Sequence, residues 1–486
     1  MQRSSGILLH ISSLPNKYGF GCFSKEAYDF VDFLHETNQK FWQVLPINPT
    51  NDSGSPFQCY SVFAGNICFI DLTEYLTEQE LIKLGVKKLK KLNFNKIYEQ
   101  RVNALKYIFK RDFKKTNLTK FVEENKFWLT DFAIFMALKE DYKTSFYNFP
   151  EKYKNYDKIA IEKYELKNQN KINFYIFTQY LFFNQWERLK KYAQRKDIKI
   201  IGDIAFYPAS DSSDVWANRK EFCFDDNGNP LAVGGVPPDY FSEDGQLWGN
   251  PIYNVEYMKK NKYKWWIKRF KHAYKFFDVA RLDHFRGFES FWACPVKAQN
   301  AKVGKWIKGL GKPFFNELFK HKNIPQFIAE DLGIITEKVK KLIEKTGLPG
   351  MKVFQFAFDG NKKNNYFPHN YINNCVAYLG THDNNTFIGF LKELDDETLT
   401  KVKLYLGKEE NSTFEELTDI AISFLMNSRA EVVILTIQDL LYLDENYRMN
   451  TPGTVENNWS FVLNKNFLSK ELIHRLKQIT FIANRN

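Results

Sequence analysis

Short apolar runs, each closed by polar residues, recur along the chain. They occupy residues 41–47, 66–72, 198–207, 276–285, 326–333, 352–360, 375–384 and 432–441. Because their apolar residues are continuous rather than alternating, the runs predict strands that are buried on both faces. Amphipathic helical patterns lie between many of them, at 24–37, 334–346 and 412–429. The first of these has Ser24 as its predicted N-cap.

The alternation of strands and helices predicts an α/β fold with a parallel sheet. Roughly eight strands in a chain of this length fit a closed (β/α)₈ TIM barrel better than an open sheet. An open doubly wound sheet stays possible, although no GxGxxG motif follows a first strand. Residues 304–312 resemble a phosphate-binding loop only superficially, because Leu310 follows Gly309 and no apolar strand precedes them.

One long stretch interrupts the strand–helix rhythm. Residues 73–195 are predominantly helical in pattern and rich in Lys, Tyr and Phe. We therefore expect an inserted, mainly helical subdomain at 73–195, and a catalytic barrel with active-site loops formed by 1–72 and 196–486.

Composition limits the class of protein. The chain is 44% hydrophobic and 17% aromatic, enough for a large core, and has no apolar run long enough to span a membrane. Its first 15 residues do not predict a signal peptide, because His10 interrupts the apolar run and Pro15 follows without a cleavage pattern. Six cysteines without CxxC or zinc spacing predict reduced thiols, so a cytoplasmic location is expected.

The formal net charge of +12 raises the question of nucleic acid. The excess lies in Lys-rich helical stretches such as 86–100 and 151–171. These stretches are typical of solvated helix faces rather than of a phosphate-reading stripe, so nucleic-acid binding is not expected.

Charged residues gather at the ends of four predicted strands. They are Asp203, then Arg281, Asp283 and His284, then Glu330 and Asp331, then His382 and Asp383. The C-terminal strand ends of a barrel converge on one mouth. Each group alone could belong to an ordinary turn, but acids, bases and Arg at four strand ends indicate an active site.

Glycoside cleavage fits this inventory, because it needs two carboxyl groups flanking one bond. The segment 235–254 adds aromatic residues that could stack on sugar rings, mixed with polar ones that could bind hydroxyls: Asp239, Tyr240, Phe241, Gln246, Trp248, Asn250 and Asn254. Phe57 and Tyr60 are further candidates for stacking. A metal site is the chemical rival. Adjacent side chains such as His382 and Asp383 point to opposite sides of an extended strand, so a metal site is not expected. No cofactor is expected either.

Long motifs extend this interpretation. They are RSSGILLHISSLP (3–15), SGSPFQCYSVFAGN (53–66), GDIAFYPASDSSDVWAN (202–218), GGVPPDYFSEDGQLWGNPIYN (234–254), ARLDHFRGFESFWACP (280–295), IAEDLG (328–333), PGMKVFQFAFDG (349–360), LGTHDNNT (379–386) and RMNTPGT (448–454). Nearly end to end, the chain resembles the 4-α-glucanotransferases of the amylomaltase type, glycoside hydrolase family 77. The resemblance implies an α-amylase-like barrel with inserted subdomains and no C-terminal β-sandwich.

The resemblance also implies roles for individual residues. Asp283 would be the nucleophile, Glu330 the general acid/base, and Asp383 the carboxylate that holds sugar hydroxyls and stabilises the transition state. The implied substrate-binding residues are Arg281, His284, His382, Asp203, Ser55, Phe57, Asp239, Gln246 and Trp248. The implied substrates are α-1,4-glucans and maltooligosaccharides, with glucose as an acceptor, and the implied state is a monomer or weak homodimer.

Physical chemistry sets conditions on these roles. Arg281 should favour the ionised form of Asp283, and burial with neighbouring carboxylates should raise the pKa of Glu330. A separation of roughly 5–5.5 Å between these two carboxyls would predict retention of the α configuration. Transfer would exceed hydrolysis if the 235–254 segment held an acceptor and placed water poorly.

Some positions depart from the family pattern. Phe57 stands where the family usually has Tyr, Asn385 replaces a common Asp, and ENNW at 456–459 replaces the usual GNW ending. None is expected to touch the three acids. An α-glucan hydrolase and an inactive glucan-binding protein remain as alternatives, and the intact Asp283, Glu330 and Asp383 argue against the second.

Overall fold

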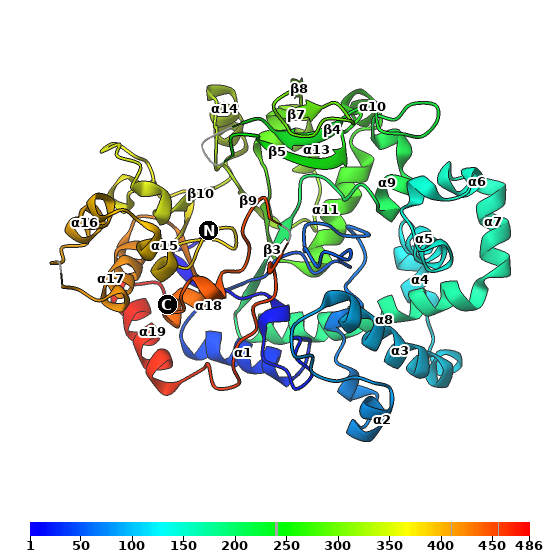
Figure 1. Cartoon of the computed structure of the whole chain (residues 1–486), viewed down its shortest axis with the longest axis horizontal. Coiled ribbons are helices and arrows are strands. Elements are labelled where there is room, and N and C mark those ends of the chain that lie inside the picture. The colour runs from blue at the N-terminus through cyan, green and yellow to red at the C-terminus, as the bar shows by residue number, and fades with distance from the viewer. Residues whose placement is uncertain (239–241, 410, 455) are drawn as a thin grey trace.

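Eight parallel strands form the centre of the molecule (Figure 1). The computed structural model describes residues 1–238, 242–409, 411–454 and 456–486. The sheet order is β10-β11-β12-β1-β2-β3-β6-β9. These strands are β1 (Ser4–Leu8), β2 (Phe41–Gln43), β3 (Lys199–Ile204), β6 (Val279–Leu282), β9 (Gln326–Ala329), β10 (Gly350–Val353), β11 (Cys375–Tyr378) and β12 (Val432–Thr436).

The two ends of this strand order meet. The backbone N–H of Ala329, in β9, donates to the carbonyl of Pro349, next to β10, at 2.8 Å. The parallel sheet therefore curls into a nearly closed barrel, as the strand–helix rhythm predicts.

Helices surround the barrel. Those outside the predicted insertion are α1 (Lys25–Glu36), α9 (Ser213–Ala217), α10 (Val255–Lys260), α11 (Lys264–Phe276), α12 (Arg286–Glu289), α13 (Gly311–Leu318), α14 (Glu337–Thr346), α15 (Phe387–Glu393), α16 (Asp396–Tyr405), α17 (Phe414–Asn427), α18 (Ile437–Leu440) and α19 (Lys470–Ile482). The described residues after β12 contain helices and no strand, so no C-terminal β-sandwich is present in them. No helix in the described ranges is long and apolar enough to cross a membrane.

The stretch 73–195 is helical wherever it forms regular structure. It contains α2 (Glu78–Lys83), α3 (Phe94–Asp112), α4 (Thr119–Asn125), α5 (Leu129–Tyr142), α6 (Glu151–Lys154), α7 (Lys158–Lys167) and α8 (Gln169–Arg195). Helices α2 to α7 lie to one side of the barrel, opposite α15 to α17 (Figure 1). The longest helix, α8, packs against both α5 of this group and α1 of the barrel. The partition into two subdomains stays a prediction.

One predicted strand is wrong. Residues 66–72 form two short 3₁₀ turns, Ile67–Phe69 and Leu72–Glu74, because polar side chains cap them. Asn66 accepts a hydrogen bond from the N–H of Cys68, and Asp71 accepts one from Thr73, each at 3.0 Å. The eighth barrel strand is instead β1, whose Ser-Ser-Gly start weakens the apolar signal.

A second sheet was not predicted. It is antiparallel, in the order β5-β4-β7-β8, with β4 (Val233–Val236), β5 (Gln246–Pro251), β7 (Ser290–Cys294) and β8 (Lys305–Lys308). Part of the segment 235–254, which contains the candidate sugar-binding residues, is therefore strand. Glycines obscured this pattern. A Cβ on Gly234 would lie 2.5 Å from the ring of Tyr207, so the close packing requires glycine.

Candidate active site

The C-terminal ends of the barrel strands meet at one cavity of about 540 Å³. Its lining includes eight of the residues expected in the site: Ser55, Phe57, Gln246, Trp248, Asp283, His284, His382 and Asp383. Three further expected residues lie next to this lining. Arg281 contacts Asp283, Asp203 contacts Arg281, and Glu330 accepts a hydrogen bond from His284. Asp239, with its neighbours Tyr240 and Phe241, falls outside the described residues.

A buried arginine joins two of the carboxylates. Arg281 donates from both terminal nitrogens to Oδ1 of Asp283, at 2.6 and 2.9 Å, and its Nε lies 3.0 Å from Oδ2 of Asp203. Arg281 and Asp203 are paired across β3 and β6, which places their side chains on the same face of the sheet. The guanidinium therefore holds the nucleophile candidate against the barrel wall.

Burial and Arg281 act in opposite directions on these acids. Burial raises the pKa of Asp283, and Arg281 opposes the rise without cancelling it. The expected contact is thus present, but its effect is smaller than that of burial. Burial likewise raises the pKa of Asp203 to about 7, again against Arg281. The carboxyls of Asp283 and Asp203 therefore hold their protons more tightly than in water.

Glu330 meets the condition for a general acid. Its Oε2 accepts a hydrogen bond from the N–H of His284 at 2.8 Å, and its Oε1 accepts one from Leu332 at 2.7 Å. Burial raises the pKa of Glu330 to about 7; Arg281 lowers it and the charge of Asp283 raises it. The expected upward shift is confirmed. The carboxyl can therefore hold a proton near neutral pH.

The backbone at His284 is in an unusual conformation. Its φ of 50° lies in the left-handed region, which costs a non-glycine residue roughly 1 kcal/mol. This conformation aims the His284 N–H at Glu330, so the residue next to Asp283 touches the acid candidate. The strained turn brings the two catalytic candidates to one point.

The side chain of His284 faces the cavity. Burial lowers its pKa to about 3, so the imidazole is neutral. Trp248, on β5, meets its ring edge to face at 4.9 Å. Among the described residues, Nε2 of His284 has no hydrogen-bond partner. A neutral imidazole with an unused nitrogen suits a sugar hydroxyl.

Asp383 lies in a different environment. His382 Nε2 lies 3.2 Å from its Oδ2, and Asn450 donates to its Oδ1 at 2.7 Å. Burial acts to raise the pKa of Asp383, but His382 and Asn450 together hold it below its usual value. The pKa of His382 is raised: burial acts to lower it, and the Asp383 carboxylate outweighs that effect. This pair favours an ionised carboxylate.

The contact between His382 and Asp383 corrects an expectation. In an extended strand these adjacent side chains would point to opposite sides, which is the arrangement that the sequence predicts. Here the chain has left β11 and turns, with Asn384 accepting from the N–H of Thr381 at 2.9 Å, so both side chains meet. Within the described ranges, no group of three or more His, Cys, Asp or Glu residues could hold a metal ion.

Two contributors were missed by sequence reasoning. Asn450 belongs to the RMNTPGT motif, but its contact with Asp383 spans 67 positions along the chain. Trp459 lines the cavity and contacts Phe57 at 5.9 Å between ring centroids. Phe57 in turn stacks on His382 at 5.1 Å and 19°. The Phe at this position therefore packs against the histidine that contacts Asp383.

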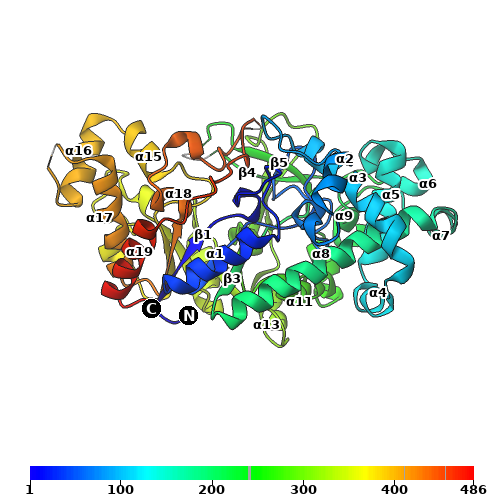
Figure 2. The same ribbon diagram turned by 90° about the horizontal axis from the view of Figure 1, so that it is seen from below.

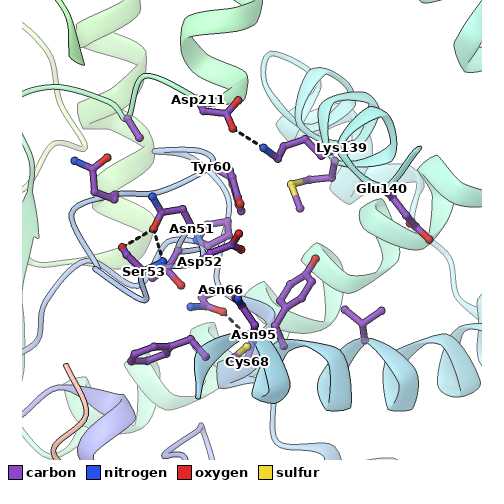
Figure 3. Close-up of a pocket in the computed structure, with 18 of the residues that line it drawn as sticks. Asn51, Asp52, Ser53, Tyr60, Asn66, Cys68, Asn95, Lys139, Glu140 and Asp211 are labelled. Carbon is purple, nitrogen blue, oxygen red and sulfur yellow. Dashed lines mark hydrogen bonds and ion pairs between the residues drawn. The ribbon is translucent and has the colours of Figure 1, made fainter. Parts of the chain in front are cut away.

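A second cavity of about 740 Å³ adjoins the first and shares Ser53 and Gln58 with it. Figure 3 shows side chains of the loop around Asn51 facing Lys139 and Glu140 of α5. Lys139 pairs with Asp211 and lies 4.8 Å above the ring of Tyr60. Tyr60, expected near the sugar site, thus lines this neighbouring cavity rather than the one that holds Asp283.

Comparison with known proteins decides the family. A family model described as 4-alpha-glucanotransferase, glycoside hydrolase family 77, matches residues 9–466. The chain belongs to this family.

Relatives within the 4-alpha-glucanotransferase family match the whole chain. The enzyme of Streptococcus pneumoniae is 42% identical over 497 residues, covering 100% of this chain and 98% of the relative. That of Aquifex aeolicus is 41% identical over 479 residues, covering 98% of each. The expected family and enzyme class are confirmed, and they favour a glucanotransferase over the hydrolase and binding-protein alternatives.

Solved structures of two amylomaltases have the same fold as this chain. The amylomaltase from Streptococcus agalactiae in complex with acarbose is similar with a TM-score of 0.95 and 37% identity, covering 100% of both chains. Amylomaltase from Corynebacterium glutamicum shares the fold, with a TM-score of 0.79 at 17% identity, over 98% of this chain and 75% of that one. The barrel expected from the sequence is therefore confirmed.

Proposed function

We propose that this 4-alpha-glucanotransferase moves α-1,4-glucan segments from a donor maltooligosaccharide to the 4-hydroxyl of an acceptor glucan or glucose. The proposed nucleophile is Asp283, and the proposed general acid/base is Glu330. The observation that carries the assignment is the turn at His284, whose N–H binds Glu330 at 2.8 Å directly after Asp283. A similar amylomaltase was solved in complex with acarbose, which supports an oligosaccharide ligand.

In the first step, Glu330 donates its proton to the glycosidic oxygen. A carboxylate oxygen of Asp283 attacks the anomeric carbon, the bond to the leaving sugar breaks, and a covalent glucosyl ester forms. Arg281 holds Oδ1 of Asp283 by two hydrogen bonds, so we assign the attack to Oδ2. The leaving sugar departs with the proton from Glu330.

In the second step, Glu330 is a carboxylate and accepts the proton of the acceptor's 4-hydroxyl. The acceptor oxygen attacks the anomeric carbon, and the ester bond to Asp283 breaks. Two inversions at one carbon retain the α configuration. Glu330 recovers its proton and is ready for another donor.

Asp383 would act on the sugar without forming a bond to it. Its pKa is held low by His382 and Asn450, so its negative charge would bind sugar hydroxyls and face the positive charge that develops at the anomeric centre. His284 would accept or donate one further hydrogen bond to a hydroxyl through its unused Nε2. These two residues would position the donor sugar.

Transfer competes with hydrolysis of the glucosyl ester. Gln246 and Trp248, on β5, line the cavity, and Trp248 contacts the ring of His284. A wall of this kind would hold an acceptor sugar and displace loosely bound water. The preference for transfer over hydrolysis is thus assigned to β5 and the segment before it.

Incubation with maltotriose tests this proposal. The expected products are maltooligosaccharides longer than maltotriose, together with free glucose, resolved by chromatography. Asp283→Asn is the matched control and should produce neither, because the amide cannot form the ester. Glucose and maltose without longer products would identify a hydrolase and contradict the proposal.

A further inference from the structure

A groove separate from the candidate active-site cavity, with which it shares no lining residue, lies next to the second sheet. It has a volume of about 690 Å³ and lies between α10, β8, α13 and α14. These elements gather around the second sheet along one edge of the molecule (Figure 1). Its floor is apolar and is made by Ile252, Val255, Ile307, Leu310 and Leu342.

Six lysines surround this floor: Lys259, Lys308, Lys312, Lys338, Lys341 and Lys345. In the part of the chain that the structure describes, none of their ammonium groups has an ion-pair partner, whereas the neighbouring Lys340 pairs with Glu337 at 2.7 Å. Glu256 and Glu289 also line the groove. The groove therefore concentrates positive charge around a concave surface.

Three of the six lysines lie on one face of α14. Lys338, Lys341 and Lys345 follow the i, i+3, i+7 pattern, which places them on one face of the helix with Leu342 between them. Like charges at such spacing repel one another. A bound anion would relieve that repulsion.

The N-terminus of α13 contributes neutral donors. Gly311 and Lys312, its first two residues, line the groove, and no side chain caps this end of the helix. The first backbone N–H groups of a helix lack partners within the helix and carry its positive end. They supplement the lysines as groups that bind an anion.

We propose that this groove, defined by the six lysines and the apolar floor, binds a small molecule that carries a polyphosphate group and is of nucleotide size. Lysine ammonium groups and helix N–H groups bind phosphate oxygens, and the apolar floor takes the organic part. The volume falls within the usual range for small-molecule sites. An uncharged glucan does not account for six unpaired cations, so this ligand is distinct from the substrates of transfer.

Calorimetric titration of the full chain tests the proposal with three probes: ATP, inorganic tripolyphosphate and adenosine. ATP and tripolyphosphate should bind, adenosine should bind far more weakly, and affinity should fall as salt rises. Comparable affinities for ATP and tripolyphosphate would assign recognition to the phosphates, and a tighter ATP complex would add the apolar floor. Absence of binding by both phosphates at physiological salt would overturn the proposal.

A charge-matched pair of variants locates the site. K338Q/K341Q/K345Q removes three groove lysines, and K87Q/K90Q/K91Q removes three exposed lysines elsewhere. Gln keeps nearly the same helix propensity as Lys on α14, and the control lysines are exposed between α2 and α3, so both variants should fold and keep their transfer activity on maltotriose. The groove variant should lose at least about tenfold in ATP affinity, and the control should lose none. Equal losses in both would indicate general attraction to a basic protein and contradict the proposal.

Discussion

The three acids at the barrel mouth differ in their immediate neighbours rather than in their chemistry. Asp283 is held by Arg281, Glu330 by two backbone N–H groups, and Asp383 by His382 and Asn450. The pKa of Glu330 is raised to about 7 by burial, while that of Asp383 is lowered. Carboxyls with separated pKa values can serve as acid and as permanent anion in one reaction.

The first prediction follows from the pKa of Glu330. The proton that it donates is bound below a pKa of about 7 and lost above it. We expect kcat/KM for transfer from maltotriose to fall as pH rises through this value, measured from about pH 5 to about pH 9. A rate that stays level across the alkaline range would contradict the role of Glu330 as the acid.

The second prediction concerns Asn450 as a positioning residue. Asn450→Ala removes the hydrogen bond to Asp383, so kcat/KM should fall by roughly tenfold to a hundredfold. The loss should appear mainly in kcat, and Asn450→Asp should lose more, because a second carboxylate would repel Asp383. Asn446→Ala, at an exposed position nearby, is the control and should match the original chain. If Asn450→Ala had the same kcat and KM as the original chain, Asn450 would not be needed to position Asp383.

The sequence points to the charged residues of the candidate site more directly than to their neighbours. Asp283, Glu330 and Asp383 each follow an apolar strand, and strand ends converge by the geometry of a barrel. Asn450 follows no such rule, because an Asn in a loop is typical of any turn. Only the folded chain brings it to Asp383, across 67 positions.

At the scale of elements, two glutamines on α8 explain why an apolar run did not form a strand. Gln179 binds both the N–H and the carbonyl of Gly65, at 2.7 and 2.9 Å. Gln185 does the same for Asp71, at 2.7 and 3.0 Å. Side chains thus satisfy backbone groups that a neighbouring strand would otherwise bind. A local pattern cannot reveal partners that lie 114 residues away.

The third prediction tests this clamp. Gln185→Ala leaves the buried N–H and carbonyl of Asp71 without partners, which should cost about 2 kcal/mol or more. The apparent Tm, measured by calorimetry, should fall by several degrees. Gln169→Ala, at the exposed start of the same helix, should leave it unchanged. Equal Tm values for the two variants would show that the clamp does not stabilise the fold.

At the scale of the whole molecule, the two chain termini lie on the same side of the barrel and are linked to each other. The N and C ends lie close together below it (Figure 2). Buried Arg485 donates to five carbonyl oxygens, those of Ser4, Met426, Ser428, Ala430 and Glu431, at 2.7 to 3.2 Å. Ser4 begins β1 and Glu431 directly precedes β12, and these two strands pair in the barrel. One side chain thus ties the last turn of the chain to its first strand.

The fourth prediction concerns this tie. Arg485→Met keeps most of the side-chain volume but removes all five hydrogen bonds, so it should lower the apparent Tm by several degrees. Arg429→Met, at an exposed position nearby, is the control. Transfer activity well below the new Tm should remain, because Arg485 is remote from the catalytic cavity. An unchanged Tm would contradict a stabilising role.

The sequence predicted the barrel because seven of its strands are continuous apolar runs of the kind that both-side burial selects. It did not predict the second sheet, whose strands β4 and β5 contain glycines and whose β8 is mostly exposed. Such strands lack the continuous apolar signal. That sheet nonetheless supplies Gln246 and Trp248 to the site.

The most direct test of the mechanism traps the covalent intermediate. Glu330→Gln removes the base of the second step, and α-maltotriosyl fluoride as donor needs no proton on its leaving group, so a glucosyl ester should accumulate. Mass spectrometry of the digested protein should find the glucan attached to the peptide that contains Asp283. The double variant Asp283→Asn, Glu330→Gln should carry none. Attachment to any other residue, or the absence of an adduct while the fluoride is consumed, would contradict Asp283 as the nucleophile.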